Sequence, residues 1–171
     1  VGTKVLIDCS ADADMAAKAD APFVMGSGGT QAKMQPVSMY FIMKNVDLKR
    51  LAHWARTCDD VPARAIPEDE EGLAYGLWLT GFNNMLRSFQ AETGVQLQRE
   101  NITLKTADGQ MYVNATRVLG VDVFSPAEFT AAILECYRQI EGVCRFLKER
   151  VPGFGEARLG QVSPILLVGE T

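Results

Sequence analysis

The stretch ITLKTADGQMYVNATRV, residues 102–118, decides the fold. On both sides of its centre, apolar side chains alternate with polar ones, which is the pattern of a β-strand with one buried face. The centre reads Ala107-Asp108-Gly109-Gln110, and Asp-Gly between two alternating runs is a strong signal for a tight turn. We therefore predict an antiparallel β-hairpin and expect the rest of a sheet to assemble around it.

Further strand patterns lie on either side of the hairpin. Residues 37–43 are mostly apolar on both faces, as expected of a central strand, and residues 162–168 are apolar enough for one more. Near the N-terminus, Val5-Leu6-Ile7 has the pattern of a short buried strand that ends in the acidic turn Asp8-Cys9-Ser10.

Helix signals separate these strands. An Ala-rich helix is expected over residues 12–19, and Asp47 precedes a short helix over residues 48–56. Apolar side chains at helical spacing predict a longer helix over about residues 73–92. The clearest helix begins at Ser125-Pro126-Ala127-Glu128, a capping box with proline at the first helical position. The predicted fold class is α+β: a mixed or mainly antiparallel sheet with a central β-hairpin, packed by about three helices.

Composition narrows the function classes. The chain has 171 residues and a net charge of −4, so we expect no nucleic-acid partner, because non-specific binding to nucleic acid needs a basic field. No run of about 18 apolar residues is present, so no membrane span is expected. Four cysteines without a CxxC pair and a single histidine disfavour a metal site, and suggest reduced thiols in a cytoplasmic protein. The cysteines lack iron–sulfur cluster spacing, so the sequence leaves open whether a longer parent protein has such clusters.

Three carboxylates crowd the first predicted turn: Asp8, Asp12 and Asp14. At the carboxyl end of a strand, such groups bind a sugar hydroxyl, act as an acid/base pair or hold a divalent cation. The alternative is that they only cap the following helix. Two weaker candidates are Gly26-Ser27-Gly28-Gly29, as a phosphate cradle or a plain loop, and Arg117, as a ligand for an anionic group or an exposed surface residue.

Three stretches together resemble the FAD-dependent oxidoreductases related to the flavoprotein subunit of heterodisulfide reductase. Residues 5–17, VLIDCSADADMAA, resemble that family's IDATGDGDVAA segment, and residues 35–41, QPVSMYF, resemble its strand that enters the substrate domain. Residues 114–118, NATRV, and later motifs up to Glu170-Thr171 follow in the family's order. The GxGxxG fingerprint with which such enzymes open is absent from this sequence.

The resemblance implies a fragment of a larger flavoenzyme. Residues 1–22 would be a remnant of the FAD-domain strand and turn, residues 23–161 a substrate or cap domain, and residues 162–171 the start of the strand that returns to the FAD domain. The implied partners are the N-terminal FAD domain of the parent chain and a small-molecule substrate. The fragment itself is expected to be inactive alone and not to retain FAD.

Site residues follow from the same resemblance. Ser10, Asp12 and Asp14 are expected on the FAD side, and Arg117 is expected to orient an anionic substrate. The family's two turn glycines are Ala11 and Ala13 here, its arginine near the end is Gly169, and Tyr137 stands where the family usually has arginine. These departures support an alternative function: a non-catalytic binding or dimerisation module with a decayed flavin site, forming a homodimer.

Overall fold

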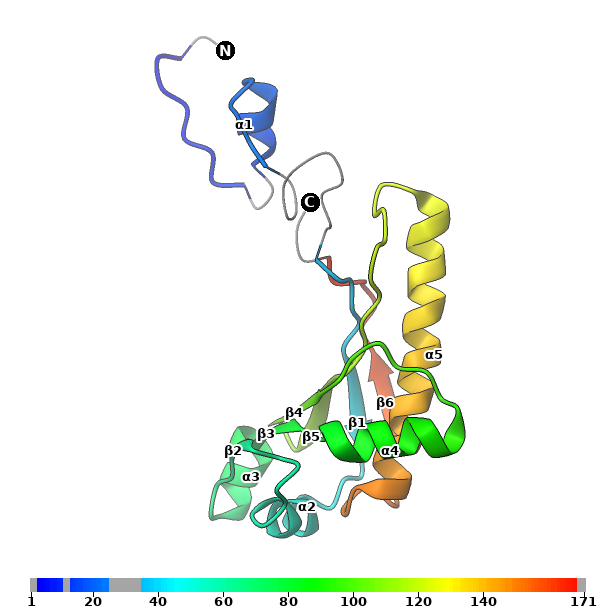
Figure 1. Cartoon of the computed structure of the whole chain (residues 1–171). Helices are drawn as coiled ribbons and strands as arrows, with labels where there is room; N and C mark the ends of the chain where they lie inside the picture. The colour runs from blue at the N-terminus through cyan, green and yellow to red at the C-terminus, as the bar shows by residue number, and fades with distance from the viewer. Residues whose placement is uncertain (1–2, 11–12, 25–34, 169–171) are drawn as a thin grey trace.

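The computed structural model describes residues 3–10, 13–24 and 35–168 of the chain. Five helices and six strands are assigned within these residues (Figure 1). They run in the order α1 (Asp14–Lys18), β1 (Phe41–Lys44), α2 (Leu48–Ala55), β2 (Ala63–Ala65), α3 (Glu70–Gly76), β3 (Trp78–Gly81), α4 (Asn83–Thr93), β4 (Ile102–Ala107), β5 (Gln110–Asn114), α5 (Pro126–Arg150) and β6 (Arg158–Val162). No helix in these ranges is long and apolar enough to cross a membrane.

The six strands form one sheet in the order β2-β3-β4-β5-β1-β6, and every pairing is antiparallel. The predicted hairpin is β4–β5, which lies in the middle of the sheet with Leu104 opposite Val113. Its turn is tight because Asp108 and Gly109 both adopt positive φ, at 49° and 68°. The α+β prediction, with a mainly antiparallel sheet and a central hairpin, is confirmed.

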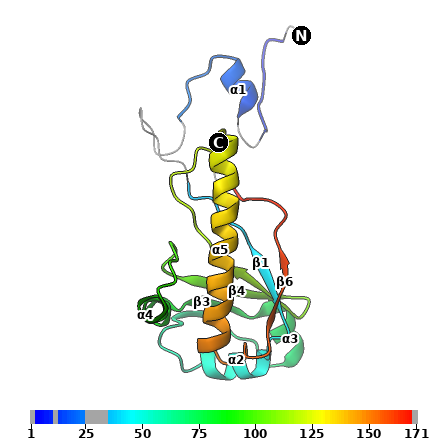
Figure 2. The same cartoon turned by 90° about the vertical axis from the view of Figure 1, so that its right-hand side faces the viewer.

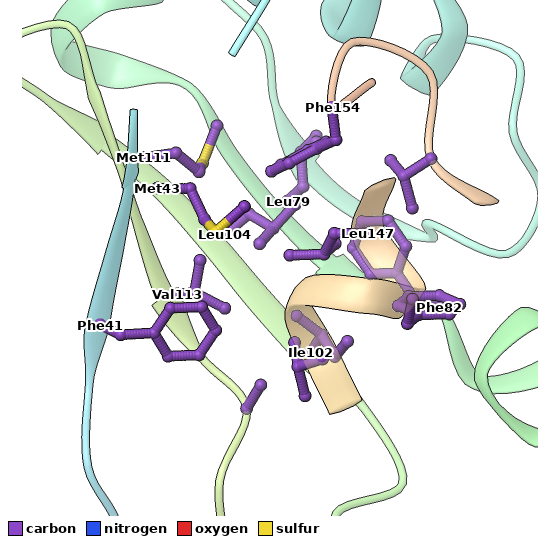
Figure 3. Packing of buried hydrophobic residues seen from close by; sticks show 14 of the residues in the cluster. Phe41, Met43, Leu79, Phe82, Ile102, Leu104, Met111, Val113, Leu147 and Phe154 are labelled. Carbon is purple, nitrogen blue, oxygen red and sulfur yellow. The ribbon is translucent and has the colours of Figure 1, made fainter. Parts of the chain in front are cut away.

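Alternate residues of the strands bury one face of this sheet under the helices. Figure 3 shows Phe41 and Met43 of β1 and Leu104 of β4 gathered with Leu147 of α5 in this core. Each of these four side chains is buried to 1% exposure or less. Burying large apolar side chains contributes about 1.5–3 kcal/mol each, so this layer is the main source of stability.

The long helix α5 begins where the capping box predicts, and it stands upright against the sheet (Figure 2). The Ser125 hydroxyl accepts a hydrogen bond from the Glu128 backbone amide at 3.4 Å. The Glu128 carboxylate accepts from the Asp122 amide at 2.8 Å, three residues before the N-cap amide of Ser125 that a reciprocal capping box would use. The buried stripe of α5 includes Cys136, Ile140 and Val143, as predicted from their helical spacing.

The prediction of one long helix over residues 73–92 is wrong. The structure divides this stretch into α3, β3 and α4, because the backbone takes two conformations that no helix accommodates. Gly81 has φ +146°, and Phe82 is left-handed at φ 70°. Asp60 then caps α4 from outside, since its carboxylate accepts from the Asn84 and Met85 amides at 3.0 and 2.9 Å. Apolar residues of this stretch lie on β3 and α4, which both pack into the same hydrophobic core.

The prediction of a buried strand at Val5-Leu6-Ile7 is also wrong for this structure. Val5 and Ile7 are 74% and 81% exposed, and no strand is assigned there. Apolar residues form a strand only beside a partner, and the described residues pair none with this segment. The predicted strand over residues 162–168 is displaced: β6 occupies Arg158–Val162, and Leu167 adds one isolated bridge to Ser38.

Gly81→Ala tests the backbone constraint between β3 and α4. A Cβ at this position would lie 2.3 Å from the Asp60 carbonyl oxygen, in a conformation that side chains rarely adopt. We expect the substitution to lower the free energy of unfolding by about 2–4 kcal/mol. The matched control is Gly155→Ala, where a Cβ meets nothing within 4 Å, with an expected change within about 0.5 kcal/mol. Chemical denaturation measures both, and equal stabilities would contradict the constraint.

Candidate functional site

The second face of the sheet is accessible. Tyr40, Trp78 and Tyr112 are 42%, 39% and 38% exposed, while the next residue of each strand is buried. We call this surface the open face, and it consists of the side chains that alternate away from the core in the four central strands. Its members are Tyr40, Ile42, Lys44, Trp78, Thr80, Thr103, Lys105, Tyr112 and Asn114.

Charge is segregated between the sheet and the rest of the chain. The six strands contain four cationic residues, Lys44, Arg64, Lys105 and Arg158, and no Asp or Glu. The whole chain nevertheless has 21 acidic and 17 basic residues, and within the described ranges the carboxylates lie on helices and connections. Because unlike charges nearby would cancel its field, a sheet without carboxylates favours an anionic partner.

A shallow pocket of about 370 Å³ lies on the open face. Tyr40 and Tyr112 line it from neighbouring strands, and Lys105 adds a cation beside them. The remaining lining residues are small or apolar: Thr103, Ala107, Val113 and Asn114. Two aromatic rings with one cation suit a flat, largely apolar ligand that carries negative charge.

A second pocket, of about 390 Å³, contains Arg99 and Arg117. It adjoins the first, because the Arg99 guanidinium donates a hydrogen bond to Asn114, a residue that lines the first pocket. The other lining residues of the second pocket are Gln35, Pro36, Ser38, Glu100, Asn101 and Thr116. Two guanidinium groups in one pocket favour an anionic group, although the Glu100 carboxylate also lines this pocket.

The backbone that carries Arg117 is held by two buried side chains. The Gln139 amide of α5 accepts from the Arg117 amide at 2.8 Å and donates to the Arg117 carbonyl at 2.9 Å. One residue earlier, the Thr116 hydroxyl accepts from the Met39 amide at 2.7 Å and donates to the Met39 carbonyl at 3.0 Å. No hydrogen bond or ion pair of the Arg117 guanidinium is found among the described residues. The backbone of Arg117 is therefore held in place, while its guanidinium is available to a ligand.

Arg99, like Arg117, is partly buried. Its Nε donates to the Asn101 side-chain oxygen at 3.3 Å, so both of its side-chain partners are neutral amides. Burial lowers the pKa of the Arg99 guanidinium from its usual value; Tyr40 opposes this shift, and the positive charge of Arg117 adds to it. An anion between the two guanidiniums would offset both lowering effects.

The acidic turn near the N-terminus is held by one carboxylate. Asp8 accepts hydrogen bonds from the Ser10 amide at 2.9 Å, the Ser10 hydroxyl at 2.7 Å and the Ala16 amide at 2.8 Å. These hydrogen bonds, that of the Ser10 hydroxyl first, lower the pKa of Asp8 to about 2. Asp14 lies exposed in the first turn of α1. Of the predicted FAD-side residues, Ser10 and Asp14 are thus close to this turn.

Asp12, Ala11 and the loop Gly26-Ser27-Gly28-Gly29 lie outside the described residues, as does Gly169. Ala13, which stands in place of a family glycine, is left-handed at φ 55°. An alanine adopts this conformation at a cost of about 1–2 kcal/mol, so the backbone keeps a shape that glycine would take freely.

No cluster of His, Cys, Asp or Glu in the described ranges could hold a metal ion. All four cysteines are free; Cys9 is exposed and Cys136 is buried. Burial raises the pKa of the Cys136 thiol, and it raises the pKa of Cys144 to about 11. Both thiols are therefore protonated at neutral pH, the unreactive form.

The sequence predicted Arg117 but missed Arg99, Tyr40 and Lys105 as its neighbours. Tyr40 lies in the quoted QPVSMYF stretch, and its alternation with Phe41 could have placed it on the solvent side of a strand. No sequence signal marks Arg99, since only the pairing of β4 with β5 brings residues 99 and 114 together.

Fold and site together describe an antiparallel sheet whose open face carries aromatic and cationic side chains. The family model of FAD dependent oxidoreductases matches residues 1–171, and the chain belongs to this family. A search of the curated proteins and a search of the solved structures each found no match. The expected resemblance to FAD-dependent oxidoreductases is confirmed at the level of this family.

The family implies FAD binding, and the open face fits one side of a flavin. Its two tyrosines offer a flat apolar wall, and the strands present no carboxylate that would repel the anionic cofactor. A complete FAD also needs a pocket for its adenine and pyrophosphate, whereas the two pockets of the described sheet, of about 390 and 370 Å³, are open to solvent.

The pKa of Asp8 predicts how the turn responds to acid. Because the value in the folded chain, about 2, lies below the ordinary 3.8, ionised Asp8 stabilises the turn above about pH 3.8. This stabilisation is lost as the pH falls toward 2. We expect an NMR titration to show the Asp8 carboxyl carbon and the Ala16 amide changing together near pH 2. Titration of Asp8 at its ordinary value, or an unchanged Ala16 amide in Asp8→Asn, would contradict the assignment.

Proposed function

We propose that this chain is the substrate domain of an FAD-dependent oxidoreductase, and that its open face forms the substrate-facing wall of the flavin site. The observation that carries the proposal is an accessible sheet face without carboxylates, lined by Tyr40 and Tyr112 and flanked by Arg99 and Arg117. FAD, when bound, supplies the electron or hydride transfer. The chain's own residues bind, orient and shield the substrate.

Arg117 is proposed to hold an anionic group of the substrate. Gln139 forms hydrogen bonds to both the amide and the carbonyl of Arg117, and Thr116, one residue earlier, is bonded to Met39. The backbone of Arg117 is therefore already ordered before a ligand binds, which lowers the entropic cost of binding. Holding a substrate to a fraction of an ångström matters for transfer reactions, because reactivity falls steeply with misplacement. Gln139 thus acts as a positioning residue for Arg117.

Tyr40 and Tyr112 are proposed to cover the apolar part of the substrate. Tyr112 lies on β5, and Tyr40 immediately precedes β1, the neighbouring strand. Lys105 is opposite Tyr112 on β4, and Asn114 follows Tyr112 two residues later on β5. A flat body lying over these rings would exclude water from the reacting atoms. Lys105 provides a further positive charge at the edge of this pocket.

The N-terminal segment is proposed to belong to the FAD-binding domain of the parent protein. Val5 and Ile7 are exposed apolar side chains at alternate positions, as in a strand whose neighbours lie in another domain. Asp8 orders the turn that follows by hydrogen bonds to Ser10 and Ala16, so that Ser10 and Asp14 lie close to this turn. Ser10, Asp12 and Asp14 are the proposed contacts to FAD.

Substitution of Arg117 tests the substrate role in the intact flavoprotein. We expect Arg117→Gln to weaken binding of an anionic substrate or inhibitor by about tenfold to a hundredfold, the effect of losing a charge-assisted hydrogen bond, with an unchanged FAD content. The matched control is Arg87→Gln on α4, an exposed arginine on the helical side, with no expected change. Equal affinities of the two variants would contradict the role of Arg117.

Substitution of Asp14 tests the cofactor side separately. We expect Asp14→Ala to lower the ratio of FAD to polypeptide in the purified flavoprotein, measured by flavin absorbance. An unchanged ratio would remove Asp14 from the proposed FAD contacts. The alternative of a dimerisation module makes a different prediction: the open face would be buried between two copies, and light scattering would report twice the mass of the chain.

A further inference from the structure

Tyr40 stands at the end of a chain of three hydrogen-bonding side chains on the open face. Arg99 Nη1 donates to Asn114 Oδ1, and Asn114 Nδ2 donates to the Tyr40 hydroxyl at 3.0 Å. The three residues come from the connection before β4, from β5 and from the residue before β1. This chain joins the two pockets of the candidate site.

The direction of each hydrogen bond follows from Arg99. A guanidinium has donors only, so the amide oxygen of Asn114 must face Arg99. The amide nitrogen of Asn114 must then face Tyr40, and the Tyr40 oxygen must accept. The hydroxyl proton of Tyr40 is left for another partner. None of the hydrogen bonds found among the described residues uses Tyr40 as a side-chain donor.

The surroundings of Tyr40 define what that partner is. Its hydroxyl is next to a pocket with two aromatic rings and Lys105. The adjoining pocket holds Arg99, Arg117 and the carboxylate of Glu100. Tyr40 is 42% exposed, so a ligand in the pocket can reach it. Tyr40, Lys105 and Arg99 all present hydrogen-bond donors, so a ligand with only hydrogen-bond donors is disfavoured at this pocket.

We propose that Tyr40 is a dedicated hydrogen-bond donor, oriented by Arg99 through Asn114, and that it selects a flat carboxylate, aromatic or unsaturated, by donating to one of its carboxylate oxygens. This inference rests on the proposed function, since it assigns the substrate class of the same open face. Arg117 and Tyr40 have separate roles. Arg117, in the adjoining pocket, attracts the carboxylate through its positive charge, and Tyr40 donates a hydrogen bond to one carboxylate oxygen.

Asn114→Asp replaces the side-chain amide by a carboxylate and so reverses the direction of the hydrogen bond between residue 114 and the Tyr40 hydroxyl. A carboxylate still accepts from Arg99, but it accepts from Tyr40 as well, so the Tyr40 proton turns inward. The matched control is Asn101→Asp. It adds the same charge beside the same arginine, because Asn101 accepts from Arg99 Nε at 3.3 Å, and it has no hydrogen bond to Tyr40. Tyr40→Phe removes the hydroxyl without adding a charge.

The experiment uses the whole chain, with benzoate as the probe and the tyrosine Cζ carbon of labelled protein as the NMR signal. Without benzoate, we expect Asn114→Asp to move the Tyr40 Cζ signal as a change from acceptor to donor does, and Asn101→Asp to leave it near the wild-type position. With benzoate, we expect Tyr40→Phe and Asn114→Asp to bind about tenfold more weakly than wild type, and Asn101→Asp to lose clearly less.

Three results would overturn the inference: wild-type affinity for benzoate in Tyr40→Phe, equal Tyr40 signals in the two Asp variants, or no saturable benzoate effect at Tyr40 in the wild type. Arg117→Gln separates this inference from the proposed function. If only Arg117→Gln weakens benzoate binding, the anionic site stands and the task of Tyr40 is wrong. If only the Tyr40 and Asn114 variants weaken it, Tyr40 is confirmed and the role of Arg117 is wrong.

Discussion

The register of β5 between β4 and β1 is the constraint on which the rest of the structure depends. Side chains alternate along a strand, so a slip of one residue would turn Tyr112 and Asn114 into the core. Buried hydroxyls oppose such a slip at both ends of the hairpin: Thr106 bonds to Leu77 and Leu73, and Thr116 bonds to both backbone groups of Met39. Breaking the hydrogen bonds of Thr106 or of Thr116 leaves buried polar groups unpaired, and each unpaired group lowers the free energy of unfolding by about 1–3 kcal/mol.

This register also places the residues that stabilise the fold and the residues of the candidate site on opposite faces of the sheet. The core face gathers the large apolar side chains under the helices, while the open face keeps aromatic rings, cations and amides available to a ligand. Gln139 is the link between the two, because it is fully buried on α5 and yet fixes the backbone of Arg117. A rigid helical layer thereby holds groups that an incoming anion would otherwise have to order.

Local signals in the sequence were sufficient for the hairpin and for α5. Asp108-Gly109 and Ser125-Pro126 each specify a conformation through their own chemistry, and the structure has both. The sequence was not sufficient for β3, because its apolar spacing also suits a helix, and only the pairing with β4 and the backbone of Gly81 decide between them. The Arg99–Asn114–Tyr40 chain joins three distant segments, so no local pattern could reveal it.

The most direct test of the account is hydroxyl-radical footprinting of the intact flavoprotein against this chain alone. Tyr40, Trp78 and Tyr112 report on the open face, and Tyr75 of α3, 58% exposed, is an internal control on the helical side. The account predicts that the three open-face side chains react several-fold more slowly in the intact protein, while Tyr75 is unchanged. Open-face side chains that stay fully reactive while Tyr75 becomes protected would contradict it, because the flavin domain would then cover the helices.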